Sequence, residues 1–231
     1  MKKILFSILV AFSVFTVSEA KKTKVSQSAV SEQTVGDIVL RVAGKVKAGK
    51  KVEVSFSRIP ETIEEFEEVR AFLCASPAGA IALQVMAMEM YRKDAEMGTK
   101  AIEKNNITTN VNFMTRRLHE LMGRNDSYSR PYQAAAFLKG ADPSNGYNPS
   151  KPYTVVVELN PSVPSQYSND YQAEVLYFQI YTTGSDSGKR GNISVVKTLR
   201  PGEPQGYAVD NSPCLVSQVR EKSFAAEFKG L

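Results

Sequence analysis

Tryptophan is absent from this 231-residue chain, and histidine occurs once, as His119. One histidine cannot supply the paired histidines of a zinc-hydrolase helix, and two cysteines cannot complete a four-thiolate zinc site. The Gly-x-Ser-x-Gly turn that presents a nucleophilic serine in α/β-hydrolases is also missing. We therefore predict no catalytic constellation, no metal site and no cofactor, and we expect His119 to be a surface residue.

Cysteine is scarce as well, with Cys74 and Cys214 as the two examples. In an oxidising compartment an even number permits a disulfide, which would close a loop of about 140 residues. The alternative is two buried free thiols, because a free cysteine packs as a small apolar side chain. The sequence leaves both open.

A strong excess of one charge is lacking, since 29 Lys and Arg face 24 Asp and Glu, a formal net charge of +5. Nucleic-acid-binding domains usually carry a denser basic face with interleaved aromatic residues. We therefore expect no nucleic-acid partner. An envelope protein or an anionic ligand is the expected partner.

Long hydrophobic runs are limited to the start of the chain. Met1-Lys2-Lys3, the apolar stretch Ile4–Val17 and Ser18-Glu19-Ala20 follow the plan of a signal peptide over residues 1–20, cleaved near Ala20. The apolar run is shorter than the ~20 residues of a membrane span. We expect a periplasmic or secreted protein with no transmembrane segment after cleavage.

The remaining chain divides into three parts. Residues 21–35 are polar and predict a disordered leader. Residues 36–58 show the alternation of a β-hairpin, with Ala48-Gly49 at its turn, and the sequence leaves open whether it joins a later sheet. Residues 59–231 predict a single α+β domain.

Helices are predicted in the first part of that domain. Thr62 and Glu65 form a capping box, and the helix they begin turns into a second one at Ser76-Pro77. This second helix is apolar on all sides at first, which predicts burial. We expect it to run to about Met97, with Gly98 as its stop and its polar second half, including Glu89, in water. Further helices are predicted over 110–122 and 130–138.

Strands are predicted after the turn-rich segment 142–152. Their ranges are 153–160, 172–181, 192–200, 206–210 and 214–220. The predicted fold is thus α+β: an N-terminal helical hairpin plus further helices packed on a C-terminal antiparallel β-meander of three to five strands.

Two segments carry the candidate ligand-binding residues. Glycines, hydroxyls and two cations in the loop 184–191 could bind an anion, although a plain hairpin connection has the same composition. The Arg-Pro-Tyr segment could lie beside it. The candidate residues are Arg130, Tyr132, Ser185, Asp186, Ser187, Lys189 and Arg190.

We expect a non-enzymatic binding domain of the bacterial envelope. One alternative is a hydrolase whose carboxylate pair is assembled by the fold. The carboxylates available to such a pair are Asp142, Glu158, Asp170, Glu174 and Asp186. The other alternative is a structural or assembly component.

Short motifs recur in a recognisable order between about residues 60 and 222. They are Ser76-Pro77-Ala78-Gly79-Ala80, Arg130-Pro131-Tyr132, Lys139-Gly140-Ala141, Asn145-Gly146-Tyr147, Pro152-Tyr153 and Gly184-Ser185-Asp186-Ser187. This series resembles an uncharacterised bacterial family known as a domain of unknown function. The resemblance implies no activity and no catalytic residues. It also implies a tryptophan near the closing strands, which this chain lacks.

Overall fold

The computed structural model describes residues 30–108, 110–123, 126–198 and 205–223. The predicted signal peptide lies outside the described residues. The helices are α1 (Ile63–Leu73), α2 (Pro77–Lys93), α3 (Ala95–Asn105) and α4 (Asn112–Met122). The strands are β1 (Val30–Val35), β2 (Ile38–Ala43), β3 (Lys51–Phe56), β4 (Tyr153–Leu159), β5 (Gln166–Ser168), β6 (Ala173–Tyr181), β7 (Lys189–Thr198) and β8 (Gly206–Asn211).

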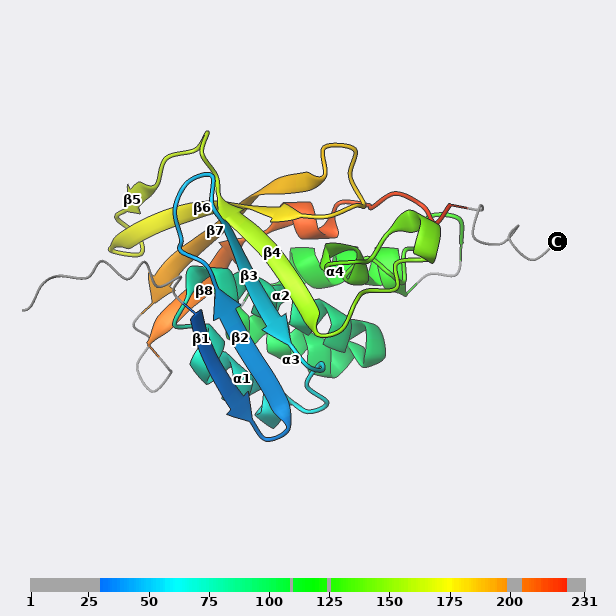
Figure 1. Ribbon diagram of the computed structural model, residues 1–231, viewed down its shortest axis with the longest axis horizontal. Coiled ribbons are helices and arrows are strands. Elements are labelled where there is room, and N and C mark those ends of the chain that lie inside the picture. Colours follow the sequence, from blue (N-terminus) through cyan, green and yellow to red (C-terminus); the bar gives the residue numbers. More distant parts are fainter. Residues whose placement is uncertain (1–29, 109, 124–125, 199–204, 224–231) are drawn as a thin grey trace, which may run out of the picture.

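All these strands belong to one antiparallel sheet with the order β1-β2-β3-β4-β6-β7-β8, and β5 pairs with β6 (Figure 1). The prediction of a C-terminal meander of three to five strands is therefore wrong. The sheet has eight strands, begins before the helices, and receives its helices from the middle of the chain. The link is the pairing of β3 with β4, where Phe56 lies opposite Tyr153. Alternation reveals strands but says nothing about a partner about a hundred residues away.

The N-terminal hairpin forms as the alternation predicted, since β2 and β3 pair antiparallel. Gly49 in its turn has a φ of +69°, a conformation that glycine adopts without a steric penalty. The predicted leader over 21–35 is wrong in its last part, because β1 occupies Val30–Val35 and pairs with β2. β1 extends the sheet beyond the predicted hairpin.

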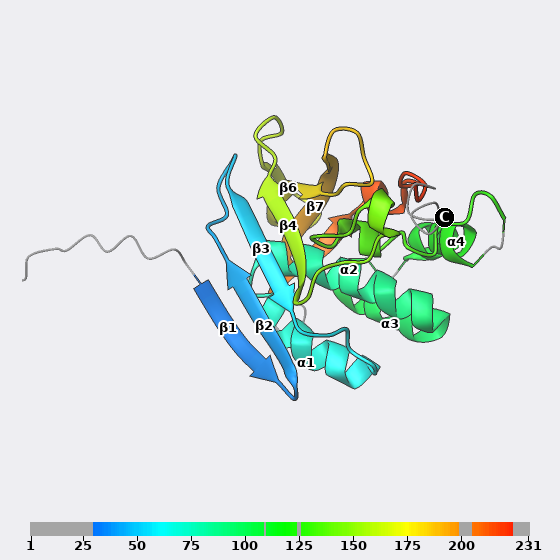
Figure 2. The same ribbon diagram turned by 45° about the vertical axis from the view of Figure 1, so that its right-hand side comes forward.

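Helix α2 lies at the centre of the core. Every residue from Pro77 to Met90 is buried, which confirms the burial predicted for its apolar first half. The helix contacts β3 and β4 as well as β7 and β8. Figures 1 and 2 show the sheet curling around it, with α1 and α3 on the same side. All sides of the apolar helix are buried because the curled sheet covers one side of it and the neighbouring helices, α3 above all, cover the other.

The predicted long helix is in fact two helices, because α2 ends at Lys93. Asp94 has an extended backbone (φ −146°, ψ 111°), and its side chain accepts a hydrogen bond from the Met97 amide at 2.9 Å, which caps α3. Gly98 therefore lies inside α3 and is not a helix stop. A Cβ at this position would lie 2.1 Å from the Tyr91 Cα, so the glycine lets α3 pack directly on α2.

Other boundaries follow local signals to different degrees. Thr62 caps α1 as predicted, accepting from the Glu65 amide at 3.2 Å, whereas Ser76 makes no side-chain cap bond to α2. The helix predicted over 130–138 is a 3₁₀ turn, Ala135–Phe137. The strand predicted over 214–220 is also wrong, because this segment begins in a 3₁₀ helix, Pro213–Val216.

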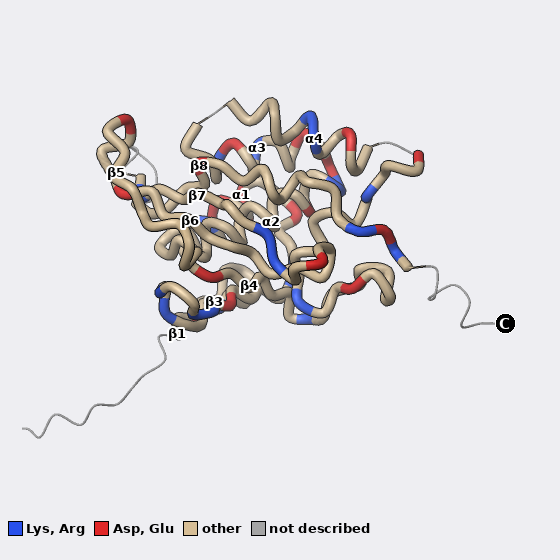
Figure 3. The backbone as a smooth tube through the Cα atoms, turned by 90° about the horizontal axis from the view of Figure 1, so that it is seen from above, with Lys and Arg blue, Asp and Glu red and all other residues tan. Residues whose placement is uncertain are grey.

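Across the described ranges, no helix combines the length and the apolar character that crossing a membrane requires. Basic and acidic residues are interspersed along the described chain (Figure 3). Any positive surface is therefore local.

Candidate ligand-binding cleft

A cleft of about 510 Å³ opens where the last turn of α2 meets the loops that precede β4. Its volume is in the range of about 300–1,000 Å³ that is typical of small-molecule sites. It is lined by three tyrosines (Tyr132, Tyr147, Tyr153), five cations (Arg58, Arg92, Lys93, Lys151, Lys222) and two acids (Glu61, Glu89). Five positive charges against two negative ones make this cleft an environment for an anion.

The three tyrosines come from three motifs that are separate in the sequence. The rings of Tyr132 and Tyr147 are stacked, with centroids 4.6 Å apart and planes 10° apart. Burial raises the pKa of Tyr147 to about 12, and its hydroxyl donates to the Arg220 carbonyl oxygen at 2.8 Å. Tyr153 packs on Phe56 at the β3–β4 pairing, with ring centroids 5.8 Å apart. One wall is thus rigid and aromatic.

Two lysines are positioned by these rings and not by carboxylates. The Lys222 Nζ lies 5.0 Å from the Tyr132 ring centroid, and the Lys151 Nζ lies 5.7 Å from that of Tyr153. An ammonium group is attracted to the face of an aromatic ring within about 6 Å. Neither these two lysines nor Lys93 makes an ion pair within the described part of the chain. Their charges remain available to a ligand.

Arg58, by contrast, is committed to the protein. Its guanidinium pairs with Asp37 at the start of β2 and with Glu65 of α1. Hydrogen bonds from Arg58, helped by the Glu61 amide, lower the pKa of Glu65 to about 2. Arg58 thus connects the N-terminal strands to the helices. Its charge is paired with these two carboxylates, so its contribution to the cleft is structural.

Glu89 occupies the last turn of α2 at the base of the cleft and is 6% exposed. Arg92 Nε donates to its Oε2 at 2.9 Å. Its other oxygen, Oε1, is buried and accepts no hydrogen bond from any residue in the described ranges. The prediction that Glu89 lies in water is wrong, because the burial of α2 extends beyond its apolar run to Glu89 and Met90.

Two sequence-predicted candidates are structural arginines. Arg130 is buried and donates to the carbonyl oxygens of Ser127 and Ser129 at 2.9 and 2.8 Å, and to Glu221 at 2.6 Å. Arg190 donates to the carbonyl oxygens of Gly184 at 3.1 Å and of Cys214, Ser217 and Gln218. The two segments do approach one another through the chain after β8, but their guanidinium groups bind backbone.

The remaining candidates in the loop between β6 and β7 are also engaged with the protein. Lys189 pairs with the buried Glu158 at 2.6 Å. Asp186 pairs with Arg220 at 3.0 Å, and the hydroxyls of Ser185 and Ser187 lie 3.1 Å apart. We call the first cleft, lined by Tyr132, Tyr147 and Tyr153, the tyrosine-rich cleft. Of the candidate residues predicted from sequence, Tyr132 alone lines it.

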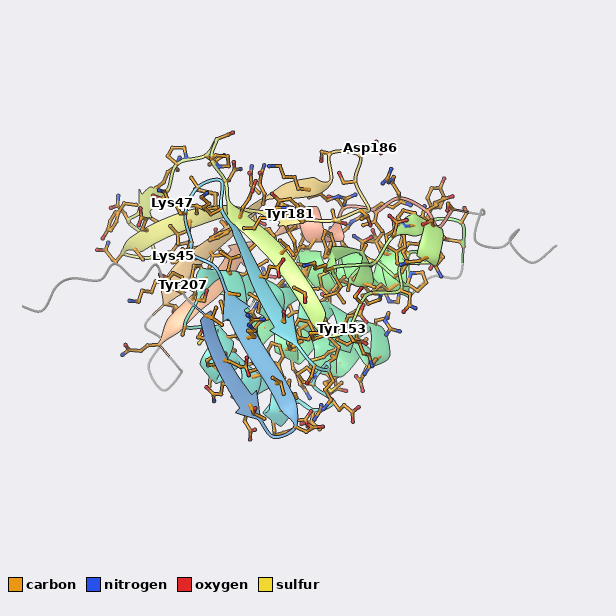
Figure 4. All side chains as sticks on the ribbon, viewed as in Figure 1. Lys45, Lys47, Tyr153, Tyr181, Asp186 and Tyr207 are labelled. Carbon is orange, nitrogen blue, oxygen red and sulfur yellow. The ribbon has the colours of Figure 1, made fainter. Side chains whose placement is uncertain are left out.

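Ser185 and Asp186 line a second cleft of about 520 Å³. Figure 4 shows Tyr181 and Asp186 above Tyr153, and Leu138 lines both clefts. Of the three cations of this second cleft, Lys139 pairs with Glu53 and Arg220 pairs with Asp186, whereas the Lys51 Nζ lies 4.2 Å from the Tyr181 ring centroid. This cleft therefore offers less free charge than the first one.

The other sequence candidates fall outside both clefts or have local roles. Cys74 and Cys214 are both buried and are not joined to one another, so the disulfide that their number permitted is not formed. His119 is exposed on α4, as predicted. No group of three or more His, Cys, Asp or Glu side chains in the described ranges could hold a metal ion.

Four of the five carboxylates proposed for a hydrolase, including Asp186 with its partner Arg220, bind groups of the protein, and the fifth, Asp170, is exposed. Asp142 caps a 3₁₀ turn through the Ser144 amide, and Glu174 binds the Ser165 hydroxyl. Glu158 is bound by Lys189 and Tyr181. The tyrosine-rich cleft instead holds Glu61 and Glu89, which the sequence did not single out because nothing local marks them.

Comparison with known proteins identifies one family, described as Domain of unknown function (DUF6935), which matches residues 58–223. The chain belongs to this family, which confirms the predicted membership of an uncharacterised domain family. No curated protein and no solved structure matches the chain. The matched range contains every residue of the tyrosine-rich cleft.

Proposed function

We propose that this member of the family is a non-enzymatic binding domain of the bacterial envelope, and that its tyrosine-rich cleft takes an anionic ligand. The observation that carries the proposal is the set of three lysines, Lys93, Lys151 and Lys222, that face the cleft without carboxylate partners in the described chain. Two of them lie over tyrosine rings, which fixes their positions without neutralising them.

The end of α2 supports the same conclusion. The C-terminus of a helix carries a partial negative charge, and Arg92 and Lys93 in its last turn offset it. An approaching anion therefore meets net positive charge at this wall of the cleft. The export of the domain is proposed from the pattern Met1–Ala20 alone.

A matched pair of charge-reversal variants tests the cleft. The triple variant Lys93→Glu, Lys151→Glu, Lys222→Glu should lower the affinity for acidic small molecules and acidic saccharides at least tenfold in calorimetric titrations.

The control is the variant Lys45→Glu, Lys47→Glu, Lys50→Glu, which makes the same change in net charge. These lysines are exposed in the β2–β3 turn, and Figure 4 shows Lys45 and Lys47 far from Tyr153. The control should bind within twofold to threefold of wild type. Equal losses in both variants would mean that overall charge, and not the cleft, attracts the ligand.

A hydrolase is the second candidate, because Glu61 and Glu89 line the same cleft and glycoside hydrolysis needs two carboxyl groups across the reacting bond. Its test is product analysis after long incubation with each saccharide that binds. Cleavage lost in Glu89→Gln while binding is retained would favour the enzyme over the binding domain.

A further inference from the structure

We infer that Glu89 determines specificity in this cleft by accepting a hydrogen bond from a ligand hydroxyl, and that the ligand is an acidic saccharide. The inference rests on the proposed function and refines it. An anion alone would satisfy the lysines. The Glu89 carboxylate, in addition, needs a hydrogen-bond donor on the ligand.

The starting point is the unpaired oxygen. Glu89 is 6% exposed, its Oε2 is bound by Arg92, and its Oε1 is buried with no donor in the described residues. A buried polar atom that lacks its hydrogen bond destabilises the folded protein, and the cost is larger when the group is charged. Buried acceptors are therefore almost always satisfied, by protein, water or ligand. Oε1 itself is occluded in this structure, but Glu89 lines the cleft, so a rotation of its carboxylate would present this oxygen to a donor on a ligand bound there.

The charge around the cleft selects the kind of donor. A ligand ammonium group would be repelled by the surrounding lysines and arginines, which outnumber the acids. A hydroxyl donates without carrying positive charge. The matching ligand thus carries an anionic group for Lys151 and Lys222 and a neutral hydroxyl for Glu89.

A sugar acid combines these two features on a small rigid ring. A cleft of about 510 Å³ has room for such a ring. A hydrogen-bonding site of this kind discriminates strongly, because an analogue without the hydroxyl leaves the buried acceptor unpaired. A neutral saccharide lacks the first feature, and a simple polycarboxylate lacks the second.

Calorimetry with three kinds of probe tests the inference. The probes are an acidic panel of uronate, sulfated and phosphorylated tetrasaccharides, a neutral galactose tetrasaccharide, and propane tricarboxylate, which has three carboxylates and no hydroxyl. We expect at least one acidic saccharide to bind at least tenfold more tightly than both of the other probes. Glu89→Gln should weaken that saccharide tenfold or more and leave the tricarboxylate within twofold or bound more tightly. Glu61→Gln, which alters the exposed acid of the same cleft, is the matched control and should change saccharide affinity less than threefold.

A test on the wild-type protein covers the case in which Glu89→Gln fails to fold. Methylating the hydroxyls of the binding saccharide removes its donors and should lower its affinity at least tenfold. If the tricarboxylate binds in a lysine-dependent manner but methylation and Glu89→Gln change nothing, the role of Glu89 is refuted and the anion site stands. If none of the anionic probes binds, the proposed function itself is refuted.

Discussion

Replacing Gly98 with alanine sets local helix preference against tertiary packing. In the interior of a helix, alanine is favoured over glycine by about 1 kcal/mol, so secondary structure alone predicts a more stable protein. The structure predicts the opposite. A Cβ on Gly98 would lie 2.1 Å from the Cα and 2.2 Å from the amide nitrogen of Tyr91 in α2.

The magnitude follows from this distance. Carbon atoms in contact lie about 3.5–4.0 Å apart, so α2 and α3 would have to separate by about 1.5 Å. Both atoms in the way belong to backbone, which cannot rotate aside as a side-chain tip can. Overpacking of a core typically costs about 1–3 kcal/mol. After subtracting the helix preference, we expect a net loss of up to about 2 kcal/mol in the free energy of unfolding.

Urea denaturation followed by circular dichroism measures the change. With a slope of about 2 kcal/mol per molar urea, the midpoint should fall by up to about 1 M. Lys100→Ala, two residues further along α3 and exposed, is the control and should stay within about 0.5 kcal/mol of wild type. A Gly98→Ala protein that is more stable than wild type by the helix preference of about 1 kcal/mol would refute the close approach of the two helices.

Three further predictions concern groups that the fold has placed in unusual surroundings. Arg130→Met leaves buried carbonyl oxygens without donors, so it should lower the free energy of unfolding by about 2–4 kcal/mol, as measured by urea denaturation. Saccharide affinity should stay within twofold of wild type. A loss of affinity in the folded variant would show that Arg130 takes part in ligand binding. Burial raises the pKa of the Cys214 thiol to about 11, so iodoacetamide at about pH 8 should leave it unmodified until urea is added, and rapid labelling of the native protein would contradict its burial. Burial alone would raise the pKa of Glu158, but hydrogen bonds from Lys189 and Tyr181 outweigh this and hold the pKa below its ordinary value. Since the folded pKa is the lower one, the stabilisation by Glu158 is present above the unfolded pKa and is lost as the pH falls through the folded pKa. Glu158→Gln should therefore show a shallower loss of stability on acidification than wild type, and identical pH profiles would contradict the pairing.

Signals that act within one turn or one strand were predictable from sequence. Thr62 caps α1 because its oxygen needs to reach an amide three residues away, and the burial of α2 follows from an apolar surface on all its sides. The alternation of apolar and polar residues likewise predicted the strands β2, β3, β4 and β6. Their membership of one sheet was not, since β3 and β4 are separated by all four helices.

Competing local signals account for the misplaced boundaries. Asp94 and Gly98 both mark helix ends in the statistical sense. The structure uses the aspartate as the cap of a new helix and the glycine as a contact point between two helices. Choosing between these roles requires knowing that α3 folds back on α2, which is a property of the tertiary structure.

The candidate site shows the same limit in its electrostatics. Arg130 and Arg190 were predicted to bind an anion from the composition of the loop 184–191 and a nearby Arg-Pro-Tyr segment, yet each binds backbone carbonyls of the segment after β8. Lys222 lies 90 residues from Tyr132 and comes to rest over its ring. Whether a cation is free for a ligand depends on which acceptors the fold brings within reach of it. Arginine, with five donors in a planar group, is readily satisfied by carbonyl oxygens, whereas a lysine held over a ring keeps its charge exposed. The cations that define this cleft are therefore lysines that no local motif marked.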